Sequence, residues 1–256
     1  MSQRGNAPAP PTQPEALRAY LGRILGWERT EAIEHALRSI ALSVTHRAAL
    51  VLLGETNMVS IALALHRRTL GAGRPFIVTD PRRMDMPATV RAPTSYTSAV
   101  AAVRAAHGGT LCMRHGRPPD DFEATVVMLR DPSSDVQLVI CSDVFQAMHP
   151  FLIRPVPILV PALGMRVREL PRIVDAYARD ALDALGADDA CFTKADRRWV
   201  LDRAPRSLAE IETATLRLVA LRQAGTIDGA ARRRGMAHVS LTRWLGRRQW
   251  PGYGTT

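Results

Sequence analysis

The chain of 256 residues has little of several residue types, and each shortage excludes a class of protein. Its three cysteines, Cys112, Cys141 and Cys191, lack the spacing of a metal site, and two of them lie in apolar runs, which is typical of buried free thiols. No apolar stretch reaches the roughly 18 residues that cross a bilayer. Residues 1–14 lack the apolar core of a signal peptide and predict a flexible tail. We therefore expect a cytoplasmic protein without a membrane segment or a bound metal.

Lysine is nearly absent, because Lys194 is the only lysine among the 34 lysine and arginine residues. With 24 acidic residues the chain carries a formal net charge of +10, which predicts a polyanionic partner but does not determine the fold. From Gly229 to the C-terminus there are six arginines and no acidic residue: Arg232, Arg233, Arg234, Arg243, Arg247 and Arg248. A solvated basic face would explain these arginines, but contact with nucleic acid is the interpretation that we favour.

Short apolar runs alternate with helical patterns through the first two thirds of the chain. The apolar runs predict strands at 49–53, 75–79, 109–113, 136–141 and 156–160. Apolar residues at helical spacing predict helices at 15–25, 30–43, 62 to about 70, 98–106 and 122–129. From Glu169 onward the pattern is helical only. This order indicates an α/β domain, with a parallel sheet that helices cover on both faces, followed by an all-α part.

The first predicted strand runs into a turn and a helix, which is the layout of a phosphate-binding loop. A working loop reads G-x-x-x-x-G-K-[ST], with glycines for close backbone approach and a lysine for the β- and γ-phosphates. Here Val59 stands at the second glycine and Ser60 at the lysine. The degenerate loop comprises Gly54, Glu55, Thr56, Asn57 and Ser60. Its backbone amides could still bind an anion, but a tight turn that only packs is the interpretation that we favour.

The C-terminal region predicts three helices, of which the last two are joined by a tight turn. Residues 208–221 carry apolar side chains at helical spacing. The pair Ala230-Ala231 is small enough for two helices to cross closely, and Gly235 allows a sharp turn between them. Two leucines at i, i+4 then face inward, Leu241 and Leu245. This is the pattern of a helix-turn-helix, and a helical hairpin that only packs is the alternative.

These features together resemble the bacterial enhancer-binding proteins, the sigma-54 transcription activators, which join an AAA+ domain to a Fis-type helix-turn-helix. Four stretches are similar to family motifs in the correct order: 65–77 to "AIHR…RPF(V/I)", 108–111 to "GGTL", 157–163 to "PI.LPPLR" and 169–171 to "DIP". The segment 225–245 resembles the Fis-type "GN…AA..LGIS..TLYRKL". The resemblance covers residues 30–248, and it implies a P-loop AAA+-like domain at 15–165, a helical lid at 166–206 and a DNA-binding unit at 207–256.

The chain departs from this family where the family hydrolyses ATP. The Walker B strand should end in two acids that hold Mg²⁺ and activate water, but Arg114 and His115 stand there, and an arginine has the wrong charge for a magnesium site. The family's sensor asparagine and arginine align with Asp143 and Ala209, and the interval 80–107 lacks the "GAFTGA" loop that contacts sigma-54. Phosphoryl transfer needs metal, lysine and acid together. We therefore expect no enzyme activity and no cofactor, with passive ATP binding as the alternative.

In the resemblance, the last helix lies in the major groove of DNA with its first residues near the base edges. Arg243 is the best candidate for contact with guanine, and its predicted face also carries His238, Ser240 and Thr242. The remaining arginines are candidates for phosphate contacts that position the protein without specifying sequence: Arg232, Arg233, Arg234, Arg247 and Arg248.

The sequence thus predicts a DNA-binding transcriptional regulator built on a catalytically inactive AAA+ domain, acting as a homodimer or higher oligomer. Two alternatives remain. One is a non-catalytic adaptor that associates with active AAA+ subunits or with another protein of the transcription machinery. The other is an ordinary ATP-binding, sigma-54-dependent activator, as the family resemblance alone would imply.

Overall fold

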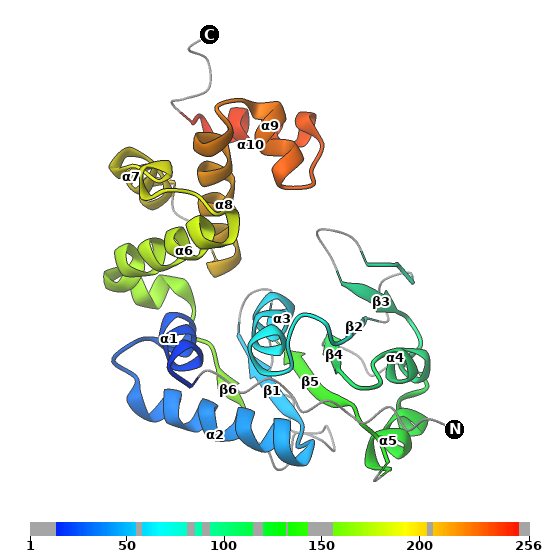
Figure 1. Cartoon of the computed structure of the whole chain (residues 1–256). Coiled ribbons are helices and arrows are strands. Elements are labelled where there is room, and N and C mark those ends of the chain that lie inside the picture. The colour runs from blue at the N-terminus through cyan, green and yellow to red at the C-terminus, as the bar shows by residue number, and fades with distance from the viewer. Residues whose placement is uncertain are drawn as a thin grey trace. The chain divides into compact units, whose positions relative to one another are not determined.

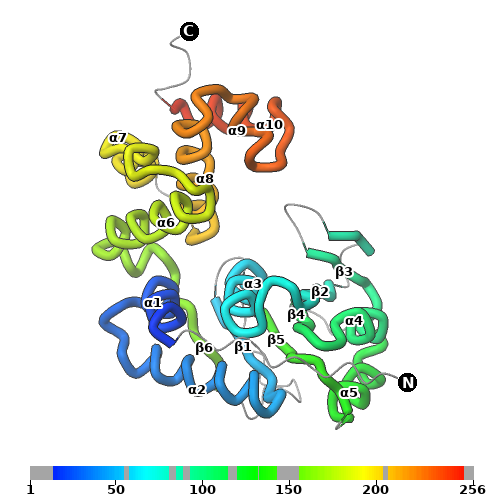
Figure 2. The backbone as a smooth tube through the Cα atoms, in the orientation of Figure 1, coloured from blue at the N-terminus to red at the C-terminus, as the bar shows by residue number. Residues whose placement is uncertain are grey.

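The chain folds into two compact units that divide between Pro161 and Ala162 (Figure 1). The computed structural model describes residues 14–54, 58–80, 85–88, 93–114, 120–131, 133–142, 156–203 and 207–250, and the path of the backbone can be followed in Figure 2. Over these residues, no helix combines the length and the apolar character that crossing a membrane requires. The predicted lid and the predicted DNA-binding segment belong to the same unit.

The first unit is built on a six-stranded sheet whose paired strands all run parallel, in the order β3-β2-β4-β5-β1-β6. The strands are β1 (Leu50–Leu53), β2 (Phe76–Thr79), β3 (Thr94–Tyr96), β4 (Thr110–Arg114), β5 (Gln137–Ser142) and β6 (Ile158–Leu159). The helices are α1 (Pro14–Leu25), α2 (Thr30–His46), α3 (Met58–Thr69), α4 (Ala99–Ala105) and α5 (Phe122–Arg130). Strand β1 lies between β5 and β6, and parallel sheets form their ligand crevices where the strand order reverses in this way.

Helices cover both faces of this sheet, as the sequence predicted. Leu111 on β4 belongs to an apolar cluster that includes Ala102 and Val103 of α4, with Phe122 of α5 packed against it. The side chain of the preceding residue, Thr110, points to the opposite face because side chains alternate along a strand. There Thr110 hydrogen-bonds to α3 and to Gln137 on β5, which bonds in turn to α2. Helices α2 and α3 therefore cover one face, and α4 and α5 the other.

Five of the six strands fall on the predicted apolar runs, and the sixth, β3, was not predicted. Strand β3 has the sequence Thr-Ser-Tyr and pairs with β2 at the edge of the sheet. Only its central residue, Ser95, is buried. A three-residue polar strand carries no apolar run, so hydrophobic patterning does not reveal it. Its pairing with the buried strand β2 stabilises it instead.

The second unit contains only helices in its described part. They are the 3₁₀ helix η1 (Leu163–Glu169), α6 (Leu170–Leu185), the 3₁₀ helix η2 (Asp189–Cys191), α7 (Lys194–Asp202), α8 (Leu208–Ala224), α9 (Ile227–Arg233) and α10 (His238–Arg248). Local sequence fixes their ends. Helix α6 is followed by Gly186, whose φ is 57°. Helix α7 begins with a capping box: the Thr193 hydroxyl accepts a hydrogen bond from the backbone amide of Asp196, and the Asp196 carboxylate accepts one from the backbone amide of Thr193.

Helix α8 is one continuous helix that packs against both α6 and the α9–α10 pair. On one side Val219 contacts Ala181 and Leu182 of α6. Near its end, the approach of α9 is so close that a Cβ atom on Gly229 would lie 3.1 Å from the Cβ atom of Ala224. Helix α8 therefore contacts helices from both the predicted lid and the predicted DNA-binding segment.

Candidate functional site

Gly54, which follows β1 where a phosphate-binding loop would begin, is closely packed by described residues. The backbone amide of Gly54 donates to the carbonyl of Ser142 (3.0 Å). A Cβ atom on Gly54 would lie 3.0 Å from both Sδ and Cε of Met58 and 3.1 Å from the carbonyl oxygen of Val160. Met58 itself is buried. A side chain at position 54 would therefore have to displace the end of the Met58 side chain or the Val160 backbone slightly, so the described residues around Gly54 provide close packing.

Arg114, at the predicted Walker B position, ends β4 beside a buried carboxylate. Its Nη1 atom lies 3.6 Å from Oδ2 of Asp80, which follows β2; the Arg114 side chain is 41% exposed and that of Asp80 6%. The buried Asp80 carboxylate thus forms an ion pair with Arg114. A positive charge at this edge of the sheet opposes binding of Mg²⁺ and favours an anion or the internal ion pair that the structure contains.

Several predicted site residues lie outside the described residues, namely Glu55, Thr56, Asn57, His115 and Asp143. Ser60 lies in the first turn of α3, in the first unit, and Ala209 in the first turn of α8, in the second unit. Among the residues that the structure does describe, no three His, Cys, Asp or Glu side chains group as metal ligands.

Helices α9 and α10 form a compact pair joined by residues 234–237. Helix α9 is capped by Thr226, whose hydroxyl accepts from the amide of Gly229 (3.1 Å). Gly235 in the connection has a φ of 55°, a conformation that favours glycine because it has no Cβ atom. Ala230 and Ala231 are buried on the inner side of α9. The small residues and the glycine that the sequence singled out thus lie where the two helices meet.

One face of α10 is buried and the other is exposed and basic. The buried side chains are Leu241, Trp244 and Leu245. The exposed residues on its first three turns are His238, Val239, Arg243, Gly246 and Arg247. Ser240 and Thr242, which the sequence placed on the exposed face, are only partly exposed, and the Thr242 hydroxyl is buried without a hydrogen-bond partner among the described residues. Val239 was not predicted as a surface residue, and its 61% exposure is a property of the fold that no motif signals.

The buried face of α10 packs against α7 and α8 through tryptophans and arginines. The ring of Trp244 meets that of Trp199 on α7 edge to face, with centroids 5.6 Å apart. The guanidinium of Arg217 on α8 lies 4.8 Å from the Trp244 ring centroid, and that of Arg248 lies 5.4 Å from it. Such contacts add cation–π attraction to the burial of apolar area. They fix the direction in which the exposed face of α10 points.

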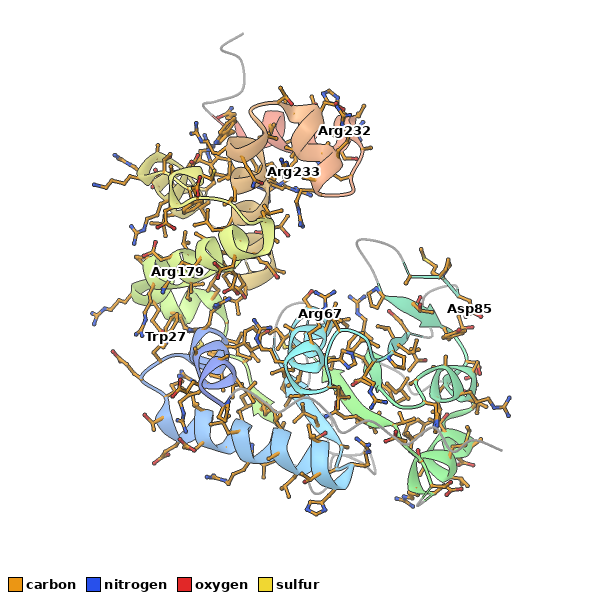
Figure 3. All side chains as sticks on the ribbon, viewed as in Figure 1. Trp27, Arg67, Asp85, Arg179, Arg232 and Arg233 are labelled. Carbon is orange, nitrogen blue, oxygen red and sulfur yellow. The ribbon has the colours of Figure 1, made fainter. Side chains whose placement is uncertain are left out.

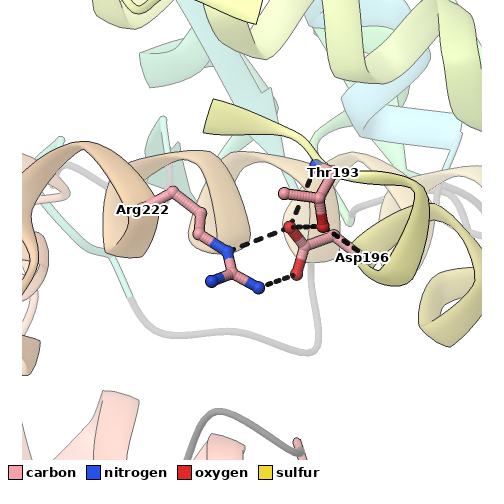
Figure 4. A network of polar contacts seen from close by, with 3 residues as sticks. All are labelled: Thr193, Asp196 and Arg222. Carbon is pink, nitrogen blue, oxygen red and sulfur yellow. Dashed lines mark hydrogen bonds and ion pairs between the residues drawn. The ribbon is translucent and has the colours of Figure 1, made fainter. Parts of the chain in front are cut away.

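A second polar network connects α7 with α8 (Figure 4). The guanidinium of Arg222 on α8 donates two hydrogen bonds of 3.1 Å to the two carboxylate oxygens of Asp196. Asp196 also accepts from the amide and the hydroxyl of Thr193. Although burial alone would raise it, these donors keep the pKa of the Asp196 carboxyl below its usual value. Arg222 also lies 5.3 Å from the ring centroid of Trp250, just after α10.

The six C-terminal arginines differ in their surroundings. Arg232 and Arg233 lie exposed on α9 (Figure 3), and Arg232 forms an ion pair with Asp228 one turn earlier. Arg248 is partly exposed and lies 3.6 Å from Glu210 on α8. The Arg248 guanidinium therefore helps to hold α10 against α8 and is also partly open to solvent. Arg243 and Arg247 are exposed on the outer face of α10, so both are accessible candidates for contact with a polyanion.

The chain matches no protein-family model, and no curated protein matches its sequence. Two crystal structures of NtrX from Brucella abortus are similar to it. The structure in complex with ADP is 14% identical over 92% of this chain and 72% of that chain, with a TM-score of 0.47. The structure in complex with ATP is 17% identical over 86% of this chain and 68% of that chain, with a TM-score of 0.41.

Proposed function

We propose that this protein is a sequence-specific DNA-binding regulator in which a helix-turn-helix is built onto a catalytically inactive AAA+-like body. The observation that carries the proposal is the exposed basic face of α10. Arg243 and Arg247 project from it, and no acidic residue follows Gly229. An α-helix of this kind fits the major groove, where an arginine can donate two hydrogen bonds to guanine.

The packing around α10 supports a role in recognising DNA bases, because a helix that recognises bases must be held rigidly. Trp244 and Leu245 are buried beneath it, and Trp199 and Arg217 hold the Trp244 ring from two other helices. This scaffold leaves the first turns of α10 exposed. Side chains on a fixed helix lose little conformational freedom on binding, which raises both affinity and discrimination between bases.

The absence of ATP hydrolysis is part of the proposal, and features of both the sequence and the structure support it. Ser60 stands where a phosphate-binding lysine would be, and Arg114 stands where an acid would hold Mg²⁺. Arg114 is paired with the buried Asp80, and Met58 packs against Gly54 at the turn. The regulator would then act by occupying DNA or by recruiting a partner, and its α/β unit would serve as an interaction platform.

The second candidate function is an adaptor that associates with active AAA+ subunits and contacts DNA only secondarily. The Arg114–Asp80 ion pair favours the adaptor as much as it favours the DNA-binding regulator, since both functions require the AAA+-like fold but no ATP hydrolysis. Co-purification with an intact ATPase would support the adaptor. Magnesium-dependent ATP hydrolysis by the purified chain would instead support the remaining alternative, an ordinary sigma-54-dependent activator.

The test is selection of bound fragments from a genomic DNA library at about 150 mM salt, where weak backbone binding is suppressed. We expect wild-type protein to enrich one site and Arg243→Ala to lose that enrichment, with a cost of about 1–3 kcal/mol at the guanine contact. Arg198→Ala is the matched control, because it removes the same charge from an exposed position on α7. Equal, sequence-independent binding by all three proteins would reject the reading role of α10.

A further inference from the structure

We infer that α10 reads a thymine through Val239, one helical turn before Arg243. The inference rests on the proposed DNA binding and adds a base and a residue that the basic pattern does not indicate. Val239 is 61% exposed at the second position of α10. Of the large apolar side chains that the structure shows as exposed, Val239 alone lies in the basic segment after Gly229.

The position of Val239 on the helix gives it the same partner as Arg243. Residues four apart lie on the same face of an α-helix, so Val239, Arg243 and Arg247 form one exposed row. The opposite side of α10, with Leu241, is buried in the unit and is not available to a ligand. A partner that contacts the arginines of this row therefore also contacts the valine.

The chemistry of the row selects duplex DNA among polyanions. In the major groove, guanine presents two acceptors, which suit arginine, and thymine presents its C5 methyl group, which suits an apolar side chain. A valine exposed among arginines gains nothing from phosphates, but it buries apolar surface against a thymine methyl. An arrangement of Val239 one turn before Arg243 thus predicts a thymine within a few base pairs of the guanine that Arg243 contacts.

The experiment replaces thymine by deoxyuridine, which lacks only the C5 methyl group, at each position of the selected site in turn. Dissociation constants are measured for wild-type protein and for Val239→Ala. We expect one uracil substitution to weaken wild-type binding by about fourfold, as for the loss of one buried methylene equivalent. Val239→Ala should bind the thymine site more weakly and should be insensitive to uracil at that position. Val127→Ala, which changes an exposed valine of α5, is the control.

The outcomes separate this inference from the function on which it rests. Selection of a site together with a wild-type protein that tolerates uracil everywhere would overturn the role of Val239 and leave DNA reading intact. The role of Val239 is also overturned if Val239→Ala keeps the full uracil sensitivity of the wild type. If the wild-type chain selects no site, both the proposed function and this inference fail. Because Val239 is exposed, its substitution is not expected to unfold the protein, which thermal unfolding of the variant checks.

Discussion

At the scale of single residues, the most constrained titratable group is His66, in a buried polar network between α3 and the sheet. Its Nε2 donates to the carbonyl of Arg74 (3.1 Å), and its Nδ1 lies 2.8 Å from the Thr110 hydroxyl. Thr110 donates to Oε1 of Gln137 (2.9 Å), whose Nε2 donates to the hydroxyl of Ser43 (3.0 Å). All four side chains are buried. The network joins α2, α3, β4 and β5, so its loss is expected to lower the free energy of unfolding of the whole sheet.

Burial lowers the pKa of His66, with a smaller contribution in the same direction from the charge of Arg67, against the hydrogen bond to Arg74. The unfolded chain therefore binds a proton at a higher pH than the folded one, and the free energy of unfolding falls as the pH drops through the unfolded value near 6.5. We expect urea midpoints to be lower at about pH 5.5 than at about pH 7.5 for this reason.

His66→Asn should flatten that pH dependence, while costing about 1–3 kcal/mol at neutral pH because buried partners lose a hydrogen bond. His107→Asn is the control, since His107 is exposed. An unchanged pH dependence in His66→Asn, with the control equal to wild type, would show that another group is responsible.

At the scale of elements, apolar patterning predicted what depends on local sequence and missed what depends on distant partners. The strands β1, β2, β4 and β5 are short runs of buried residues, and such runs are visible in a sequence. Strand β3 is defined only by its neighbour β2. Ion pairs between side chains that are distant in sequence are equally invisible to apolar patterning.

The ion pairs Arg114–Asp80 and Arg248–Glu210 join residues 34 and 38 positions apart in sequence. No spacing rule reaches so far. The sequence therefore offered Arg248 as a phosphate contact without indicating its contact with α8. Arg243 is exposed on α10, as the sequence predicted. The sequence did not indicate the exposure of Val239, because the exposure of an apolar residue depends on which face of α10 packs against the other helices.

Because α8 packs against both α6 and α9, we predict that α6 and the α9–α10 pair unfold together. Val219 is fully buried between α8 and α6, and replacing it with alanine should cost about 2 kcal/mol by loss of buried apolar volume. If α8 couples the parts, Val219→Ala should raise hydrogen-exchange rates in α10 as much as in α6.

The matched control for this prediction is Glu212→Ala, which changes an exposed residue of the same helix. It should leave the exchange of both helices near the wild-type rates. Faster exchange confined to α6 in Val219→Ala would mean that the α9–α10 pair is stable by itself, and the coupling through α8 would be wrong.

At the scale of the whole molecule, the proposed regulator raises the question of which surface would join two copies on DNA. Helix α8 is poorly suited to pairing. Of its residues, all of which the structure describes, only Glu212 and Arg222 are exposed, and Arg222 is bonded to Asp196. Stable interfaces have an apolar centre, but Val219 of α8 is buried against α6, and Ala224 lies close to Gly229 of α9 within one chain. We therefore expect a pairing surface elsewhere than on α8.

We therefore predict that Glu212→Arg leaves the oligomeric state unchanged. A charge reversed at a two-fold interface is reversed at two equivalent positions, so it would turn any ion pair that Glu212 formed with the other copy into a repulsion. Sedimentation of the full chain, alone and on a palindromic duplex, measures the effect. Identical masses for the variant and the wild type are expected, since α8 serves the interior of one chain. A complex that loses one copy of the protein only in Glu212→Arg would place the interface on the exposed face of α8 and would contradict this prediction.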